Sequence, residues 1–145
     1  MNWIRETSKS PPQSREEVLE ERMACWVIMN GPVFPFEEQR YRKLHTEFLD
    51  RLKHPESLNN HFLAIQNSLD MIRTVPRQVT VPTLVIHGSE DPILPPDHGE
   101  ALSAAIANSR YVCIPGFGHS INQYLYGLLI QEIKQHADQI LTRDY

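Results

Sequence analysis

Two short loops in the last third of the sequence carry residue types suited to hydrolytic chemistry. The first, residues 87–92 (HGSEDP), contains Asp91, and the second, residues 115–120 (PGFGHS), contains His119. A carboxylate that orients an imidazole lets the imidazole take a proton from a serine hydroxyl and later return it to the leaving alcohol. Asp91 and His119 are therefore candidates for the acid and the base of a hydrolase.

The segments around these loops predict how the two side chains are positioned. Apolar runs at 83–86 and 111–114 are typical of buried strands, and the alanine-rich stretch 99–107 between them predicts a helix. Two strands joined through a helix form a parallel pair, and the loops that follow them emerge at the same edge of the sheet. Because neighbouring strands lie about 4.8 Å apart, we expect Asp91 and His119 to come within hydrogen-bonding reach.

Both motifs resemble the carboxyl-terminal part of α/β-hydrolases, and they are similar to the branch that includes the aclacinomycin methylesterases. The resemblance rests on residues 81–95 (VPTLVIHGSEDPILP) and 114–119 (IPGFGH). In that fold the triad runs Ser, Asp, His along the chain, with the serine in a G-x-S-x-G turn. The resemblance implies Asp91 as the acid and His119 as the base of an esterase that uses water and no cofactor. A lactonase, a thioesterase or a cofactor-free perhydrolase would share this acid and base, so these reactions stay open.

The chain departs from that family in one respect, because it contains no G-x-S-x-G turn. Ser120 has Gly118 before it but Asn122 after it, and Ser89 lies between His87 and Asp91. A serine hydrolase that lacks its nucleophile is expected to be inactive alone. Three alternatives remain open: a truncated hydrolase, one subunit of a split hydrolase, and a non-catalytic binding or assembly module.

The resemblance also implies an α/β fold class, with a helical cap before the last strands of the hydrolase sheet. We expect residues 1–78 to form a lead-in and this cap, and residues 79–145 to form the carboxyl-terminal portion of the core. Ser14 and Glu17 make a capping box, and apolar spacing predicts helices after it, over about 14–30, 36–53 and 56–69. A last helix is expected at about 123–141.

Specific side chains are expected to cover the sheet or line the helix interfaces. The crossover helix should place Ala101, Leu102, Ala105 and Ile106 against the strands, and the last helix should do so with Leu125, Leu129, Ile133 and Ile140. On the cap helices, the expected stripes are Leu19, Met23 and Trp26, then Tyr41, Leu44, Phe48 and Leu52, then Leu58, Phe62, Ile65 and Leu69.

Composition argues against several classes of partner and site. With 14 Lys and Arg against 18 Asp and Glu, the formal charge of −4 offers no basic surface for nucleic acid. The first residues carry no apolar signal region, and no apolar run is long enough to span a membrane, so a cytoplasmic protein is the default. Cys25 and Cys113 lack the spacing of a metal site, and we expect neither a metal nor a disulfide.

The other histidines show no metal-ligand spacing. His87 is interpreted mainly as a turn residue, with a polar role behind the acid as the lesser alternative. The remaining five are expected at the surface: His45, His54, His61, His98 and His136.

A sheet of two parallel strands predicts an incomplete surface. Such a sheet is marginal alone, and the strand at 83–86 or its neighbour should keep an unpaired edge that invites another chain. We expect either a homodimer through that edge or an amino-terminal partner subunit. In the complete enzyme, the ligand would be a small-molecule ester.

Overall fold

The computed structural model describes residues 14–54 and 60–142, without the side chains of residues 61 and 62. The lead-in predicted for residues 1–13 and the side chains of Leu58 and Phe62 lie outside this part. The elements are α2 (Arg15–Asn30), α3 (Glu38–Arg51), α4 (Asn60–Asn67), α5 (Leu69–Thr74), η2 (Val75–Gln78), β1 (Thr83–Gly88), α6 (Pro96–Ala105), β2 (Ser109–Ile114), η3 (Gln123–Leu125) and α7 (Tyr126–Leu141).

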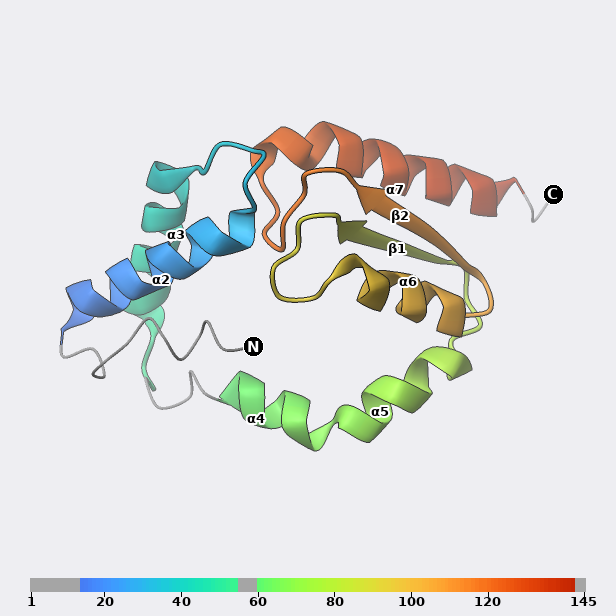
Figure 1. The fold of residues 1–145 in the computed structure, drawn as a ribbon, viewed down its shortest axis with the longest axis horizontal. Coiled ribbons are helices and arrows are strands. Elements are labelled where there is room, and N and C mark those ends of the chain that lie inside the picture. Colours follow the sequence, from blue (N-terminus) through green and yellow to red (C-terminus); the bar gives the residue numbers. More distant parts are fainter. Residues whose placement is uncertain (1–13, 55–59, 143–145) are drawn as a thin grey trace.

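The sheet consists of two parallel strands, which confirms the predicted strand-helix-strand order. β1 and β2 run in register from Thr83 opposite Ser109 to Gly88 opposite Ile114. In Figure 1 the strands lie between α6 and α7, while α4 and α5 run below α6. Since both strands end at the same level, the loops that carry Asp91 and His119 leave the sheet side by side.

The helices α2 and α3 pack against one another through an aromatic core. Leu19, Met23 and Tyr41 are buried there, and the Trp26 and Phe36 rings stack on Tyr41 at centroid distances of 5.1 and 5.0 Å. α2 begins as predicted, because the Ser14 side chain accepts a hydrogen bond from the Glu17 backbone N–H at 3.1 Å.

The helix faces differ from the prediction at several positions. α6 turns Gly99 and Ser103 inward, with Ile106 just beyond its end, while Ala101 and Leu102 are exposed. The prediction was wrong for Ala101 and Leu102 and right for Ile106, while Ala105 is half-buried. The face that meets the sheet instead passes through Gly99, where a Cβ would collide with the His87 ring. On α7, Leu125 just before the helix is buried as expected, but Ile133 is exposed.

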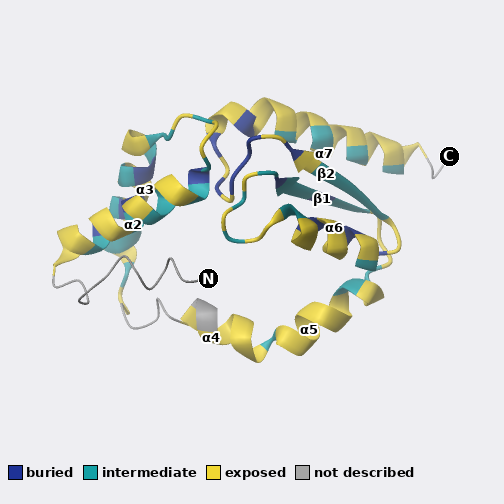
Figure 2. Ribbon diagram, viewed as in Figure 1, coloured by how far each residue is buried: buried dark blue, intermediate teal, exposed yellow. Residues whose placement is uncertain are grey.

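The third predicted helix is divided and leaves its apolar side chains in solvent. Its described part is α4, which ends at Asn67, and after Ser68 the shorter α5 follows, which was not predicted. Ile65 and Leu69 are exposed, and most of both helices is exposed in Figure 2. Leu44 on α3 is exposed as well, because the buried face of that helix runs through Tyr41 and His45. Apolar spacing therefore predicted the helices here, but it did not predict which of their apolar side chains are buried.

None of the helices in the described ranges has both the length and the apolar character needed to cross a membrane.

Substitution of Gly88 should show how tightly the two loops are packed. A Cβ at this position would lie 2.1 Å from the Phe117 carbonyl oxygen, whereas a Cβ at Gly127 in α7 would meet nothing within 4 Å. We expect Gly88→Ala to lower the free energy of unfolding by about 1–3 kcal/mol and Gly127→Ala to raise it by up to about 1 kcal/mol. Urea denaturation measures both, and equal effects would contradict the packing argument.

Candidate active site

Backbone hydrogen bonds join the two loops directly beyond the sheet. Ser89 N donates to Ile114 O at 3.0 Å and Glu90 N donates to Phe117 O at 2.9 Å. The Ser89 hydroxyl oxygen accepts from Gly116 N at 2.8 Å. These three bonds hold the loops at a fixed separation, so the side chains that they carry have little freedom to move apart.

Asp91 is held by its own turn. Its Oδ1 accepts from the backbone N–H groups of Ile93 at 2.8 Å and Leu94 at 2.9 Å, an arrangement typical of aspartate in tight turns. Only 6% of the side chain is exposed. One carboxylate oxygen is thus fully used in fixing the turn, and Oδ2 remains available to the imidazole of the other loop.

His119 meets Asp91 as the sequence predicts, with Nδ1 at 2.8 Å from Oδ2. A carboxylate oxygen only accepts, so Nδ1 carries the proton and the neutral ring keeps a lone pair on Nε2. The His119 side chain is 37% exposed. An imidazole with this tautomer, oriented by a buried carboxylate and open on its other side, can act as a general base.

A second histidine lies behind the carboxylate. The Nε2 of His87 is 3.6 Å from Asp91 Oδ2 and donates to the Leu94 carbonyl oxygen at 2.8 Å. Gly99 of α6 leaves room for this ring, since a Cβ there would lie 2.5 Å from His87 Nδ1. His87 is therefore more than a turn residue, and the polar position behind the acid, the lesser alternative from sequence, is the one observed.

The electrostatics of Asp91 reflect two opposing effects. Burial raises the pKa of this carboxyl group, but hydrogen bonds from the Leu94 N–H, His119 and the Ile93 N–H together outweigh burial and hold the pKa below its ordinary value. Asp91 is consequently a carboxylate at neutral pH, which is the state needed to orient an imidazole and to stabilise an imidazolium.

The loop that carries His119, the histidine loop (residues 115–120), is anchored to α2 as well as to the strands. The N–H groups of His119 and Ser120 both donate to the Met29 carbonyl oxygen, at 2.7 and 3.0 Å. Beside them, Asn122 Nδ2 donates to Asn30 Oδ1 at 2.8 Å. Sequence reasoning missed this contact; the closeness of Asn122 to His119 along the chain was the only available signal.

One prediction about the remaining histidines, that His45 lies at the surface, is wrong. His45 was expected at the surface but is only 6% exposed. Its Nδ1 accepts from Arg22 Nε at 3.3 Å, and burial together with the Arg22 charge lowers its pKa. His54 and His98 are exposed as expected, His136 is half-buried, and the His61 side chain lies outside the described residues. No group of three or more candidate metal ligands occurs within the described ranges.

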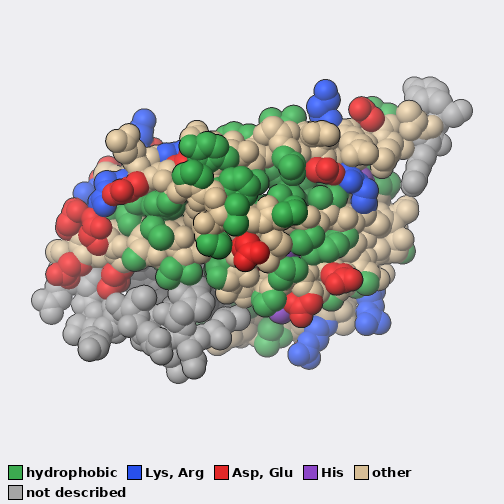
Figure 3. Space-filling view, turned by 45° about the horizontal axis from the view of Figure 1, so that its top comes forward, with side chains coloured by type: hydrophobic (Ala, Val, Ile, Leu, Met, Phe, Trp, Pro, Cys, Tyr) green, Lys and Arg blue, Asp and Glu red, His purple; other side chains and the backbone are tan. Residues whose placement is uncertain are grey.

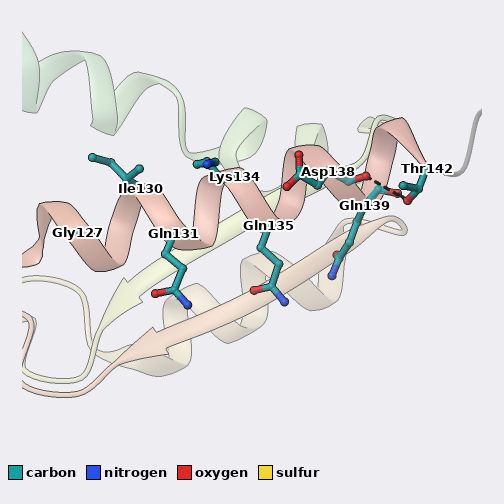
Figure 4. Close-up of a pocket in the computed structure, with 8 residues that line it drawn as sticks. All are labelled: Gly127, Ile130, Gln131, Lys134, Gln135, Asp138, Gln139 and Thr142. Carbon is teal, nitrogen blue, oxygen red and sulfur yellow. Dashed lines mark hydrogen bonds between the residues drawn. The ribbon is translucent and has the colours of Figure 1, made fainter.

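A shallow groove of about 660 Å³ lies along α7, away from Asp91 and His119. Figure 4 shows Gln131, Gln135 and Gln139 on the side of this helix that faces the strands. The lining residues are Gly127, Ile130, Gln131, Lys134, Gln135, Asp138, Gln139 and Thr142. They include no nucleophile with an adjacent base, so the groove does not compete with the Asp91 and His119 pair as a catalytic site.

Comparison with known proteins agrees with this geometry. The family model described as the alpha/beta hydrolase fold matches residues 19–123. The chain belongs to the α/β-hydrolase family. Curated relatives include the rhodomycin D methylesterases DnrP of Streptomyces peucetius and DauP of Streptomyces sp. strain C5, each 27% identical over 138 residues.

These matches cover 89% of this chain but 43% of each relative's length. The α/β-hydrolase chain described here thus spans less than half of the curated relatives that it matches. Within the family the fold expectation from sequence is confirmed.

Replacement of Asp91 should change the acid stability of the protein. A carboxyl group whose folded pKa is lowered contributes stability that is present above its unfolded pKa, near 3.8, and is lost as the pH falls through the folded pKa. We expect Asp91→Asn to be less stable than the parent at neutral pH and to lose less stability on acidification below about pH 4. Thermal unfolding between pH 2 and 7 measures the difference.

Asp97→Asn is the matched control, since that side chain is 80% exposed. Its acid profile should follow the parent. A parallel profile for Asp91→Asn would show that the carboxylate gains nothing from its partners.

Proposed function

We propose that this chain carries the acid, Asp91, and the base, His119, of a serine-type carboxylic-ester hydrolase. The supporting observation is the 2.8 Å bond from His119 Nδ1 to the buried Asp91 carboxylate, which leaves Nε2 free to accept a proton. The serine nucleophile and the oxyanion-binding N–H groups would lie outside this 145-residue sequence, which has no G-x-S-x-G turn.

In the proposed reaction, His119 Nε2 takes the proton of the serine hydroxyl as its oxygen attacks the ester carbonyl. The imidazolium then donates that proton to the leaving alcohol, and the acyl group stays on the serine oxygen. Water next attacks this acyl-serine ester while His119 Nε2 takes a proton from the water, and the imidazolium returns that proton to the serine oxygen as the carboxylic acid leaves. Asp91 holds the tautomer and stabilises the transient positive charge. No metal or cofactor enters this scheme.

The relatives' printed names suggest the kind of ester. Because both are rhodomycin D methylesterases, we propose a methyl ester of a small molecule as the substrate class. The helices α2 to α5 come before β1 in the chain, and this is the place of the cap in the family that the sequence resembles. We propose that residues 14–78 serve as that cap over the ester.

The exposed surfaces support a macromolecular partner. Within the described ranges, β1 and β2 pair only with each other, so each keeps an open edge. Leu128, Ile130 and Ile133 of α7 are 43%, 57% and 55% exposed, and hydrophobic side chains spread over the middle of the face in Figure 3. We propose that an amino-terminal hydrolase portion, or a second copy of this chain, pairs with an open edge.

A second candidate function is a non-catalytic binding or assembly module. The absence of a nucleophile turn from the sequence favours it, since the acid and base would then be retained without a serine to activate. The open strand edges would provide the binding surface by strand addition. Activity measurements separate the two functions.

The chain alone is expected to show no esterase activity, because an imidazole without a positioned nucleophile is a weak catalyst. Purified protein is assayed with an activated short-chain ester and labelled with a fluorophosphonate probe. Turnover well above that of imidazole buffer, if abolished in His119→Ala, or labelling of any serine, would reveal a nucleophile within this sequence.

Activity is expected to appear when the chain is mixed with a separately produced amino-terminal α/β-hydrolase portion that carries a G-x-S-x-G turn. His119→Ala and Asp91→Asn should each abolish it, with losses of up to about 10⁴-fold in turnover, whereas Asp97→Asn should not. Binding of the two portions without turnover would favour the assembly module.

Self-association should be visible in light scattering across a dilution series. We expect a dimer at high protein concentration that dissociates on dilution and is replaced by a heterodimer when the amino-terminal portion is added. A monomer at all concentrations, with slow amide exchange in both strands, would mean that the chain covers its own edges.

A further inference from the structure

A pair of buried asparagines lies between α2 and the histidine loop. Asn30 is the last residue of α2 and Asn122 follows His119 closely in the chain, and they are 2% and 1% exposed. Buried amides are costly unless their polar atoms are paired. Both side chains lie outside the proposed catalytic pair, so their role needs a separate explanation.

Every donor and acceptor of the two amides has a partner. Asn122 Nδ2 donates to Asn30 Oδ1 and to Pro35 O, both at 2.8 Å, and its Oδ1 accepts from Tyr124 N at 3.0 Å. Asn30 Nδ2 donates to Phe34 O at 2.7 Å and to Gly31 O at 3.2 Å. A rotated Asn122 amide would set its oxygen against two other oxygens, so this network has a single arrangement.

The backbone around this network is packed too closely to shift. A Cβ at Gly118 would lie 2.4 Å from the Met29 carbonyl oxygen, the same oxygen that accepts from His119 N and Ser120 N. The backbone of the histidine loop is therefore in direct contact with the last turn of α2. The asparagine pair holds the chain on the carboxyl side of His119, and the bonds at Ser89 and Glu90 hold it on the other side.

We infer that Asn122, paired with Asn30, is a positioning residue that fixes the His119 imidazole on Asp91. The imidazole is more than one-third exposed, so packing alone does not orient it, and the backbone position decides whether Nδ1 reaches the carboxylate. The same pair makes the orientation of the base depend on α2. This inference rests on the proposed role of His119, but its test requires no turnover.

The ring tautomer of His119 is the readout. Two-bond proton–nitrogen correlation spectra at mildly alkaline pH distinguish a neutral imidazole protonated at Nδ1 from one protonated at Nε2. We expect the parent chain to show Nδ1–H. Asn122→Ala and the isosteric Asn122→Asp both remove the two amide donors. In these variants we expect His119 to show a mixture of the Nδ1–H and Nε2–H tautomers, as an unconstrained imidazole does.

Ser103→Ala is the matched control, because Ser103 is buried at 9% exposure and its hydroxyl is hydrogen-bonded to that of Ser109, at the opposite end of the sheet. It should keep the Nδ1–H state. Retention of this state in folded Asn122 variants would overturn the inference. Equal loss in Ser103→Ala would also overturn it, since the signal would then follow overall stability.

Hydrogen exchange in the unaltered chain covers the case in which the Asn122 variants do not fold. The amides of His119 and Ser120 should open together with the last turn of α2, with protection factors that agree within about threefold. Protection of these two amides about tenfold or more below that of the helix turn would overturn the inference. If these tests succeed and the mixture with the amino-terminal hydrolase portion stays inactive, only the proposed function fails.

Discussion

The site depends on the close approach of two loops that leave parallel strands at the same level. β1 and β2 end opposite one another at Gly88 and Ile114, and only a residue without a side chain fits at Gly88, beside the Phe117 carbonyl. Ser89 and Glu90 then bond to the second loop before the chain reaches Asp91. The distance between the acid and the base is thus fixed by backbone contacts, and the side-chain hydrogen bond needs only to select the orientation of the ring.

Two separate parts of the chain share control of the imidazole. The sheet and its turns hold Asp91, whose buried carboxylate stays ionised because several N–H groups offset the cost of burial. The carboxyl end of α2 holds the backbone of His119 through the Met29 carbonyl and the Asn30 and Asn122 amides. A helical segment ahead of the sheet therefore contributes to the position of the base. A movement of α2 would shift the base, because the hydrogen bonds that join the two can form in only one arrangement.

The apolar surface is distributed unevenly over the fold. The α2–α3 contact and the end of the sheet each have a buried cluster, whereas α4, α5 and much of α7 present Leu, Ile and Met side chains to solvent. Exposed apolar side chains of this kind are typical of surfaces that contact a partner, and they are the surfaces on which the proposed partner would pack. The chain spans 43% of the length of the curated relatives. The geometry of Asp91 and His119 is observed in this chain, whereas the activity is proposed for its assembly with a partner.

The sequence alone was enough to predict the strand-helix-strand order, the start of α2 after its N-cap Ser14 and the meeting of Asp91 with His119. Those features follow from periodicity, capping chemistry and the rule that parallel strands end at one edge, all of which are local or topological. The burial of His45, the packing of α6 through Gly99 and the pairing of Asn122 with Asn30 could be seen only in the folded chain. These outcomes depend on which surfaces of distant segments fit together, and a polar side chain carries no sequence signal for the partner that satisfies it when it is buried.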